Sequence, residues 1–176
     1  MTLDEQDGVA TAIAGLFGHD PTTCIRDIRQ APHSGYRAVH VWLRIPERIE
    51  VQVRTHLQGM WANMYESAAD VLGREIRYGQ LPSSEQSQSL VLRLHDLSET
   101  IQDIEARRND VDLMRLRTAE IERSTGDETG EASTELGSRR LELEELHQAT
   151  LAEEQRMLDL CRRLRDQFTE IREQRR

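Results

Sequence analysis

The chain has 176 residues, enough for about one domain, and it is polar: 37% of the residues are hydrophobic, 31% are charged and 4% are aromatic. Its formal net charge of −9 argues against a general nucleic-acid-binding protein, because such proteins are usually basic. All 23 basic residues are arginine. Any phosphate contact from a cationic side chain must therefore come from arginine, whose planar guanidinium suits phosphate oxygens.

Membrane signals are absent from the sequence. No apolar run approaches the ~20 residues that a membrane-spanning helix needs. The first five residues, Met-Thr-Leu-Asp-Glu, lack the charged and then apolar pattern of a signal peptide. We therefore expect a cytoplasmic protein that makes no membrane contact.

The N-terminal segment predicts one helix and one short strand. Residues 4–18 carry an apolar stripe at helical spacing, with acidic residues near the start and Gly18 at the end. Residues 22–28 contain several β-branched side chains and predict a strand. A loop over residues 30–35 leads into the next strand.

Two neighbouring segments then alternate apolar and polar side chains, as half-buried strands do. On the first segment, one face carries Val39, Val41 and Leu43, and the other carries Ala38, His40 and Trp42. On the second, one face carries Ile49, Val51 and Val53, and the other carries Glu50, Gln52 and Arg54. Joined by a turn at 46–48, the segments predict a hairpin with one face in the core and a polar site on the other.

After the hairpin, the apolar period changes from two residues to about 3.6. Residues 56–72 predict an amphipathic helix, and Gly73 is a plausible stop. Residues 79–84 contain Gly, Pro and two Ser. We place a domain boundary there, so that residues 1–80 form one unit.

The remaining residues predict a coiled-coil hairpin. A long helix over 81–123 has apolar residues spaced four, three, four, three and then seven positions apart from Leu90 onward. Residues 124–134 are a polar linker. A second long helix over 135–176 has a seam of Met157, Cys161, Leu164, Phe168 and Ile171. The two helices either pack on each other or associate, through residues 84–176, with a second copy of the chain.

The polar face of the strand hairpin has two interpretations. Tyr36 is either a packing residue or a ring on which a nucleobase stacks. His40 alone is more often structural than catalytic, and Glu50 alone is more often a surface carboxylate. Together with Gln52 and Arg54, Glu50 belongs either to an ordinary solvent-exposed face or to a site. In a site, Arg54 grips phosphate and Glu50 takes a proton from a hydroxyl.

Two motifs decide between these interpretations. Residues 35–40 are Gly-Tyr-Arg-Ala-Val-His, residues 50–55 are Glu-Val-Gln-Val-Arg-Thr, and the pair Trp61-Ala62 follows on the next helix. These motifs closely resemble the second half of the RelA/SpoT alarmone synthetase domain, and the resemblance covers about residues 4–80. It implies an α+β protein: a partial nucleotidyltransferase-like mixed sheet with flanking helices, followed by the helical hairpin.

The resemblance also implies an activity and roles for the site residues. The family moves the β,γ-pyrophosphate of ATP to the 3′-hydroxyl of GDP or GTP, which yields ppGpp or pppGpp. Carried over to this chain, Tyr36 would stack on the acceptor guanine and His40 would hold the acceptor's ribose or phosphates. Glu50 would activate the 3′-hydroxyl and help to hold Mg²⁺. Gln52 and Arg54 would orient the acceptor or bind its phosphates.

Half of the family pattern is missing from this sequence. The first half of the synthetase domain supplies a basic ATP-binding segment and a Mg²⁺-binding Asp, usually within Asp-x-x-Gly-x-Arg, and we find no such pattern here. We therefore expect a RelA/SpoT-like protein of guanosine tetraphosphate metabolism that is incomplete or inactive alone. ATP would be used only if the donor half is supplied. The alternative is a guanine-nucleotide-binding or coiled-coil interaction module without catalysis.

Overall fold

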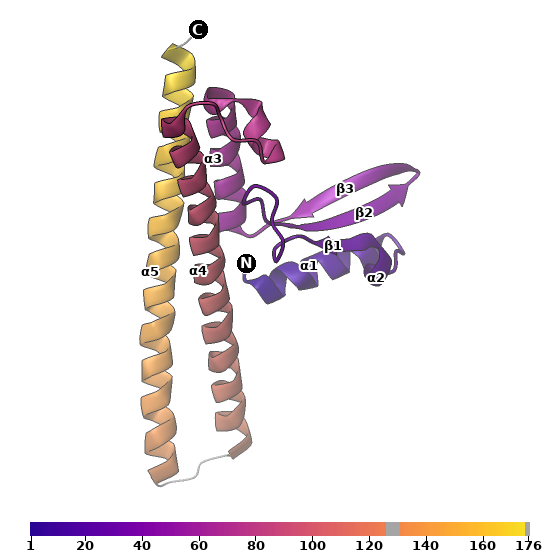
Figure 1. The fold of residues 1–176 in the computed structure, drawn as a ribbon. Coiled ribbons are helices and arrows are strands. Elements are labelled where there is room, and N and C mark those ends of the chain that lie inside the picture. Colours follow the sequence, from indigo (N-terminus) through magenta and orange to yellow (C-terminus); the bar gives the residue numbers. More distant parts are fainter. Residues whose placement is uncertain (126–130, 175–176) are drawn as a thin grey trace.

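A computed structural model describes residues 1–125 and 131–174. Three helices, α3 (His56–Leu72), α4 (Glu85–Thr125) and α5 (Glu131–Gln174), run side by side as a bundle, and a small sheet projects from its side (Figure 1). Helix α1 (Leu3–Leu16) lies along one face of that sheet. The protein is therefore α+β, as expected, and it is mostly helical.

The segment before the hairpin is more helical than the sequence suggested. Helix α2 covers Pro21–Cys24, so strand β1 is limited to Ile25–Asp27, and the expected strand over 22–28 is wrong in its first half. The cause is a local helix start that outweighs the β-branched residues. The Asp20 side chain accepts a hydrogen bond from the Thr22 backbone N–H at 2.9 Å, and Pro21 occupies the first helical position.

The sheet has the order β1-β2-β3 and is antiparallel throughout its described strands, so the expected mixed sheet is not present in them. Strand β2 spans Val39–Ile45 and strand β3 spans Glu47–Val53. Only Pro46 separates them, which makes the turn shorter than the expected 46–48. In the register, His40 pairs with Gln52 and Trp42 pairs with Glu50.

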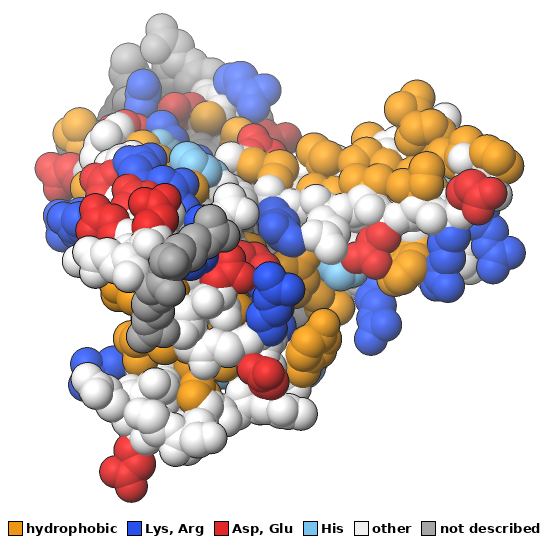
Figure 2. Space-filling view, turned by 90° about the horizontal axis from the view of Figure 1, so that it is seen from above, with side chains coloured by type: hydrophobic (Ala, Val, Ile, Leu, Met, Phe, Trp, Pro, Cys, Tyr) orange, Lys and Arg blue, Asp and Glu red, His pale blue; other side chains and the backbone are white. Residues whose placement is uncertain are grey.

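The two faces of the sheet differ, as the alternation predicted. Val39, Val41 and Leu43 are buried, and they pack with Ala10 and Ala14 of α1. Ile49 shares that face but is 43% exposed, because α1 makes most of its sheet contacts with β2 and leaves the outer part of β3 less covered. Figure 2 shows this asymmetry on the projecting arm, with hydrophobic side chains along one side and charged side chains along the other.

Helix α3 begins directly after the sheet. Thr55 is its N-cap, and the reciprocal hydrogen bonds between Thr55 and Gln58 form a capping box. The helix ends at Gly73, whose positive φ of 112° suits glycine. The short link that follows is a 3₁₀ helix, η1 (Arg74–Tyr78).

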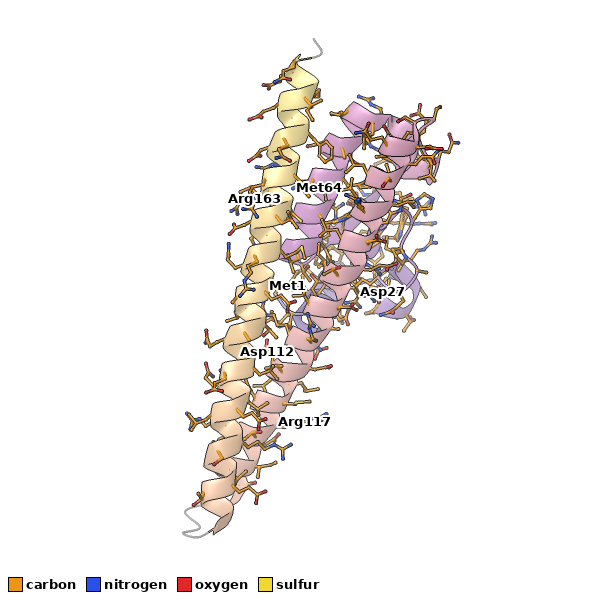
Figure 3. All side chains as sticks on the ribbon, turned by 60° about the vertical axis from the view of Figure 1, so that its left-hand side comes forward. Met1, Asp27, Met64, Asp112, Arg117 and Arg163 are labelled. Atoms are coloured by element: carbon orange, nitrogen blue, oxygen red, sulfur yellow. The ribbon has the colours of Figure 1, made fainter. Side chains whose placement is uncertain are left out.

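The largest hydrophobic core contains residues from both sides of the boundary that the sequence suggested near residue 80. It joins one face of α3 to the inner faces of α4 and α5 through fully or nearly fully buried side chains: Leu57, Trp61, Met64, Ile76, Ile101, Ile104, Leu158, Cys161 and Phe168. Met64 of α3 is completely buried and faces the two long helices (Figure 3). The α4–α5 hairpin is therefore part of the structure that supports α3 and, through Thr55, the sheet.

Ion pairs join the flanks of the long antiparallel helices. Arg107 Nη2 lies 2.8 Å from Glu153 Oε2, and Arg115 Nη2 lies 2.8 Å from Glu144 Oε2. Exposed ion pairs of this kind contribute about 0–1 kcal/mol each. Burial of the apolar side chains between the two helices therefore contributes more to the hairpin's stability. Of the linker expected over 124–134, residues 126–130 lie outside the described residues. The expectation is wrong at both ends, which are helical, since α4 reaches Thr125 and α5 begins at Glu131.

Candidate functional site

A tight turn places Tyr36 at the base of the sheet. The Tyr36 N–H donates to the His33 carbonyl at 2.9 Å, and the two central residues, Ser34 and Gly35, have positive φ values of 52° and 81°. Positive φ at both central positions is the requirement of a type I′ turn. The turn rests on the helix bundle, because a Cβ on Gly35 would lie 2.8 Å from Cζ2 of the buried Trp61.

This packing predicts opposite effects for two glycine substitutions. Gly35→Ala combines an unfavourable φ with a clash against Trp61, and we expect it to lower the free energy of unfolding by about 1–3 kcal/mol. Gly59→Ala is the matched control: it lies in α3, where an added Cβ would meet no other atom within 4 Å. It should raise stability by about 0.5–1 kcal/mol. Urea denaturation measures both, and a Gly35→Ala variant as stable as wild type would contradict the account.

The five residues predicted from the sequence meet in one closed ring of hydrogen bonds. Arg54 Nη2 donates to the Tyr36 hydroxyl at 2.7 Å, and the Tyr36 hydroxyl lies 3.2 Å from His40 Nε2. His40 Nδ1 lies 2.8 Å from Glu50 Oε1. Gln52 Nε2 donates to the same Glu50 oxygen at 3.1 Å, and Arg54 also donates to Gln52 Oε1, which closes the ring.

All hydrogen bonds of this ring are satisfied when His40 is neutral and Tyr36 and Glu50 are in their usual protonation states. Arg54 can only donate and an ionised Glu50 can only accept. Neutral His40, with its proton on Nδ1, donates to Glu50 and accepts from the Tyr36 hydroxyl. The pKa values agree with this assignment. Burial lowers the pKa of His40, and nearby Arg54 and Arg26 lower it further, against the opposing effect of Glu50. Burial raises the pKa of Tyr36, which keeps its hydroxyl proton.

The lowered pKa of His40 predicts how stability depends on pH. Because the folded state binds the His40 proton less readily than the unfolded chain, His40 contributes full stability above its ordinary pKa of 6.5, and this contribution is lost as the pH falls below that value. The same sign holds for His95, whose pKa is also lowered by burial. Between about pH 7.5 and about pH 5.5, His40→Gln should lose less stability than wild type in urea denaturation.

The exposed Arg117 supplies the control for this pH prediction, because arginine does not titrate in this range. An Arg117→Gln variant should lose as much stability as wild type over the same pH range. If His40→Gln and wild type lose equal amounts, folding does not lower the pKa of His40, and the ring does not favour its neutral form.

The Tyr36 ring is half-buried, and one side of it is occupied. The Arg54 guanidinium carbon lies 4.7 Å from the ring centroid, and the His40 ring meets it edge-on with centroids 5.8 Å apart. Next to the ring is a hollow of about 140 Å³ between the turn and α3, lined also by His33, Ser34, Asn63, Glu66 and Arg77. This volume is below the 300–1,000 Å³ of typical ligand pockets, so it fits a ring-sized part of a ligand.

Glu50 is the carboxylate of the ring and the one residue there suited to Mg²⁺. Its Oε1 accepts both ring bonds, which leaves Oε2 for a further contact. Within the described residues, no three or more His, Cys, Asp or Glu side chains form a metal-binding group. A single carboxylate still fits Mg²⁺, because this ion is often held by one or two carboxylates together with substrate phosphates.

Sequence reasoning missed the contacts that the long helix α4 makes beneath the site. Ser98 donates to the Gly35 carbonyl at 2.5 Å and lies 3.2 Å from Nε of the buried Arg37, so it holds the turn that presents Tyr36. Glu105 of α4 is buried and accepts hydrogen bonds from Thr55 and Gln58 at the start of α3. Burial raises the pKa of Glu105. Nothing local in the sequence links residues so far apart.

The comparisons with known proteins place the chain among relatives of unknown function. It is 47% identical over 107 residues to uncharacterized proteins of Mycobacterium bovis and of Mycobacterium tuberculosis, and the match covers 60% of this chain. The match spans only 39% of the length of each relative. No family model matches the chain. No solved structure matches it either. No helix among the described residues has the length and apolar character needed to cross a membrane.

Proposed function

We propose that the Tyr36–Arg54 ring is a guanine-nucleotide site, the acceptor side of a RelA/SpoT-like pyrophosphokinase. The observation that carries the proposal is the closed ring itself. It joins Tyr36 and His40 of the first family-like motif to Glu50, Gln52 and Arg54 of the second, and each bond of the ring pairs a donor with an acceptor. The hydrogen bonds of the ring thus hold the polar side chains of the two motifs together on one face of the sheet, although formation of the sheet does not require them.

In this proposal the guanine base packs beside Tyr36, in the hollow between the turn and α3. An aromatic ring and a guanidinium both offer flat surfaces for a base, and stacking on an aromatic contributes about 1–3 kcal/mol per base. Because the hollow holds only a ring-sized group, the ribose and phosphates extend along the sheet face. Arg54 then meets phosphate oxygens or keeps Tyr36 in place, and His40 contacts the ribose or phosphates.

Glu50 is the residue that can act on the 3′-hydroxyl. As an ionised carboxylate it accepts a proton from the hydroxyl, and its Oε2 is available to a Mg²⁺ ion that also binds ligand phosphates. Magnesium would neutralise charge on the transferred group. The donor segment of the family, with its Asp-x-x-Gly-x-Arg pattern, has no counterpart in the sequence. We therefore propose nucleotide binding by this chain, with little or no pyrophosphate transfer by the chain alone.

Calorimetric titration of the chain with GDP and with GTP, in the presence of Mg²⁺, tests the proposal. We expect saturable binding of GDP with one site per chain. Incubation with ATP, GDP and Mg²⁺ should yield no ppGpp. Failure of both nucleotides to bind would contradict the acceptor-site proposal. Robust ppGpp formation that disappears in Glu50→Gln would contradict the claim that the donor side is missing.

A coiled-coil interaction module without catalysis is the second candidate. The observation in its favour is that the α4–α5 hairpin, beyond the part that contacts α3, leaves large apolar side chains exposed: Met114, Leu116, Leu141 and Leu146. Such side chains suit association with another helix. If neither GDP nor GTP binds and light scattering finds a dimer, this candidate is favoured over the nucleotide site.

A further inference from the structure

Beyond Glu50, the same face of the sheet carries a concentration of positive charge. Arg44 of β2 pairs directly across from Arg48 of β3, and Arg26 of β1 pairs across from His40. Like charges at directly opposed positions of two strands destabilise a sheet. The chain carries this cost although its net charge is −9.

No carboxylate compensates for this charge within the part of the chain that the structure describes. Arg26, Arg44 and Arg48 form no ion pair there, whereas Arg29 nearby contacts both Asp7 and Asp27. Glu50, in the adjacent row of the sheet, is already engaged by the ring. The three arginines therefore present unneutralised guanidinium groups on one surface.

A hollow of about 480 Å³ adjoins these arginines, and we call it the distal arginine pocket. It is lined by Arg26, Trp42, Arg44 and Arg48, and by residues around α2. Its volume lies within the 300–1,000 Å³ range of ligand pockets. Figure 2 shows the arginine side chains gathered on the charged side of the projecting arm, opposite the hydrophobic side.

Two contacts organise the pocket before any ligand arrives. The Arg48 guanidinium carbon lies 4.1 Å from the centroid of the Trp42 ring, a cation–π contact that limits its freedom. The backbone N–H of Arg44 donates to His19 Nε2 at 3.0 Å, and His19 Nδ1 lies 2.9 Å from the Phe17 carbonyl. Through these two contacts, His19 fixes the edge of β2.

We propose that the distal arginine pocket binds the polyphosphate chain of a ligand. Several arginines that line one hollow without acidic partners match a chain of linked phosphates, because each planar guanidinium can meet two phosphate oxygens. The ligand is either inorganic polyphosphate or the triphosphate of a nucleotide. This site is separate from the guanine-nucleotide ring, and its existence does not depend on that proposed function.

Calorimetric titrations of the full chain with inorganic tripolyphosphate and with ATP test this inference. We expect saturable binding of both at low ionic strength, weakened by added salt. The double variant Arg44→Gln/Arg48→Gln should bind both probes at least about tenfold more weakly, because each substitution removes charge-assisted hydrogen bonds to phosphate. The control, Arg117→Gln/Arg163→Gln, removes two exposed arginines on α4 and α5 and should bind as wild type does.

The arms of the experiment separate the outcomes. Equal affinity for the two probes identifies the phosphate chain as the recognised group. If ATP binds more tightly than tripolyphosphate and Trp42→Ala abolishes the difference, the pocket also contacts the nucleoside. Binding of ATP without binding of tripolyphosphate overturns the proposal, as does equal weakening in both double variants. GDP titration of Arg44→Gln/Arg48→Gln distinguishes the sites: GDP affinity should be unchanged, and parallel loss of GDP and tripolyphosphate would contradict a separate pocket.

Discussion

Removing residues 83–176 should unfold the remainder of the chain. The α3 face that contains Leu57, Trp61 and Met64 packs on the long helices, which supply Ile101, Ile104, Leu158, Cys161 and Phe168 to the same core. Fully burying one large apolar side chain contributes about 1.5–3 kcal/mol. Loss of several such contacts is comparable to the whole stability of a typical domain, about 5–15 kcal/mol.

Circular dichroism and urea denaturation of a 1–82 fragment measure this effect. We expect the fragment to lack a cooperative transition. The control is the full chain with Leu116→Ala and Leu141→Ala, two side chains that are 68% and 69% exposed on the outer part of the hairpin. It should unfold as wild type does. A cooperative transition in the 1–82 fragment would mean that the hairpin is an appendage and not a support for the site.

Arg54→Gln should abolish most guanine-nucleotide binding. Arg54 donates to Tyr36 and to Gln52 and lies over the Tyr36 ring, so its loss breaks both branches of the ring. Truncating one member of a partly buried, charge-assisted pair costs about 2–5 kcal/mol of binding, which corresponds to about a 30-fold or larger loss of affinity. Calorimetric titration with GDP measures the loss.

The matched control for Arg54 is Arg117, an exposed arginine on α4 (Figure 3). Arg117→Gln removes the same charge from the chain and should leave GDP affinity unchanged. Equal affinity in wild type and Arg54→Gln would show that the ring does not hold the nucleotide. Equal weakening in both variants would point to the net charge of the chain as the cause.

The sequence was sufficient to predict the site face because its information is local. Strand alternation placed His40 on one face of the first strand and Glu50, Gln52 and Arg54 on the matching face of the second, and the register joins them. Extending the same alternation by one step would also have found Arg44 and Arg48. Roles in catalysis and Mg²⁺ binding stay predictions, since they depend on a bound nucleotide.

Other features of the fold could not be predicted, because they depend on competing local preferences or on contacts between residues far apart in the sequence. The Asp20 cap and Pro21 turned an expected strand start into α2. Ile49 has the alternation of a core residue, yet it is exposed because α1 does not cover it. Ser98 supports the Tyr36 turn from a helix more than 60 positions away. The composition change near residue 80 could not reveal that the core continues across it.

The most direct test of the account is GDP affinity in two tyrosine variants. Tyr36 belongs to the ring, whereas Tyr78 is 75% exposed on η1. Loss of a stacking contact worth about 1–3 kcal/mol should make Tyr36→Ala bind GDP about 5- to 150-fold more weakly in calorimetric titration. Tyr78→Ala should bind GDP as wild type does. If Tyr36→Ala retains the wild-type affinity while the protein stays folded, the guanine nucleotide does not bind at this ring.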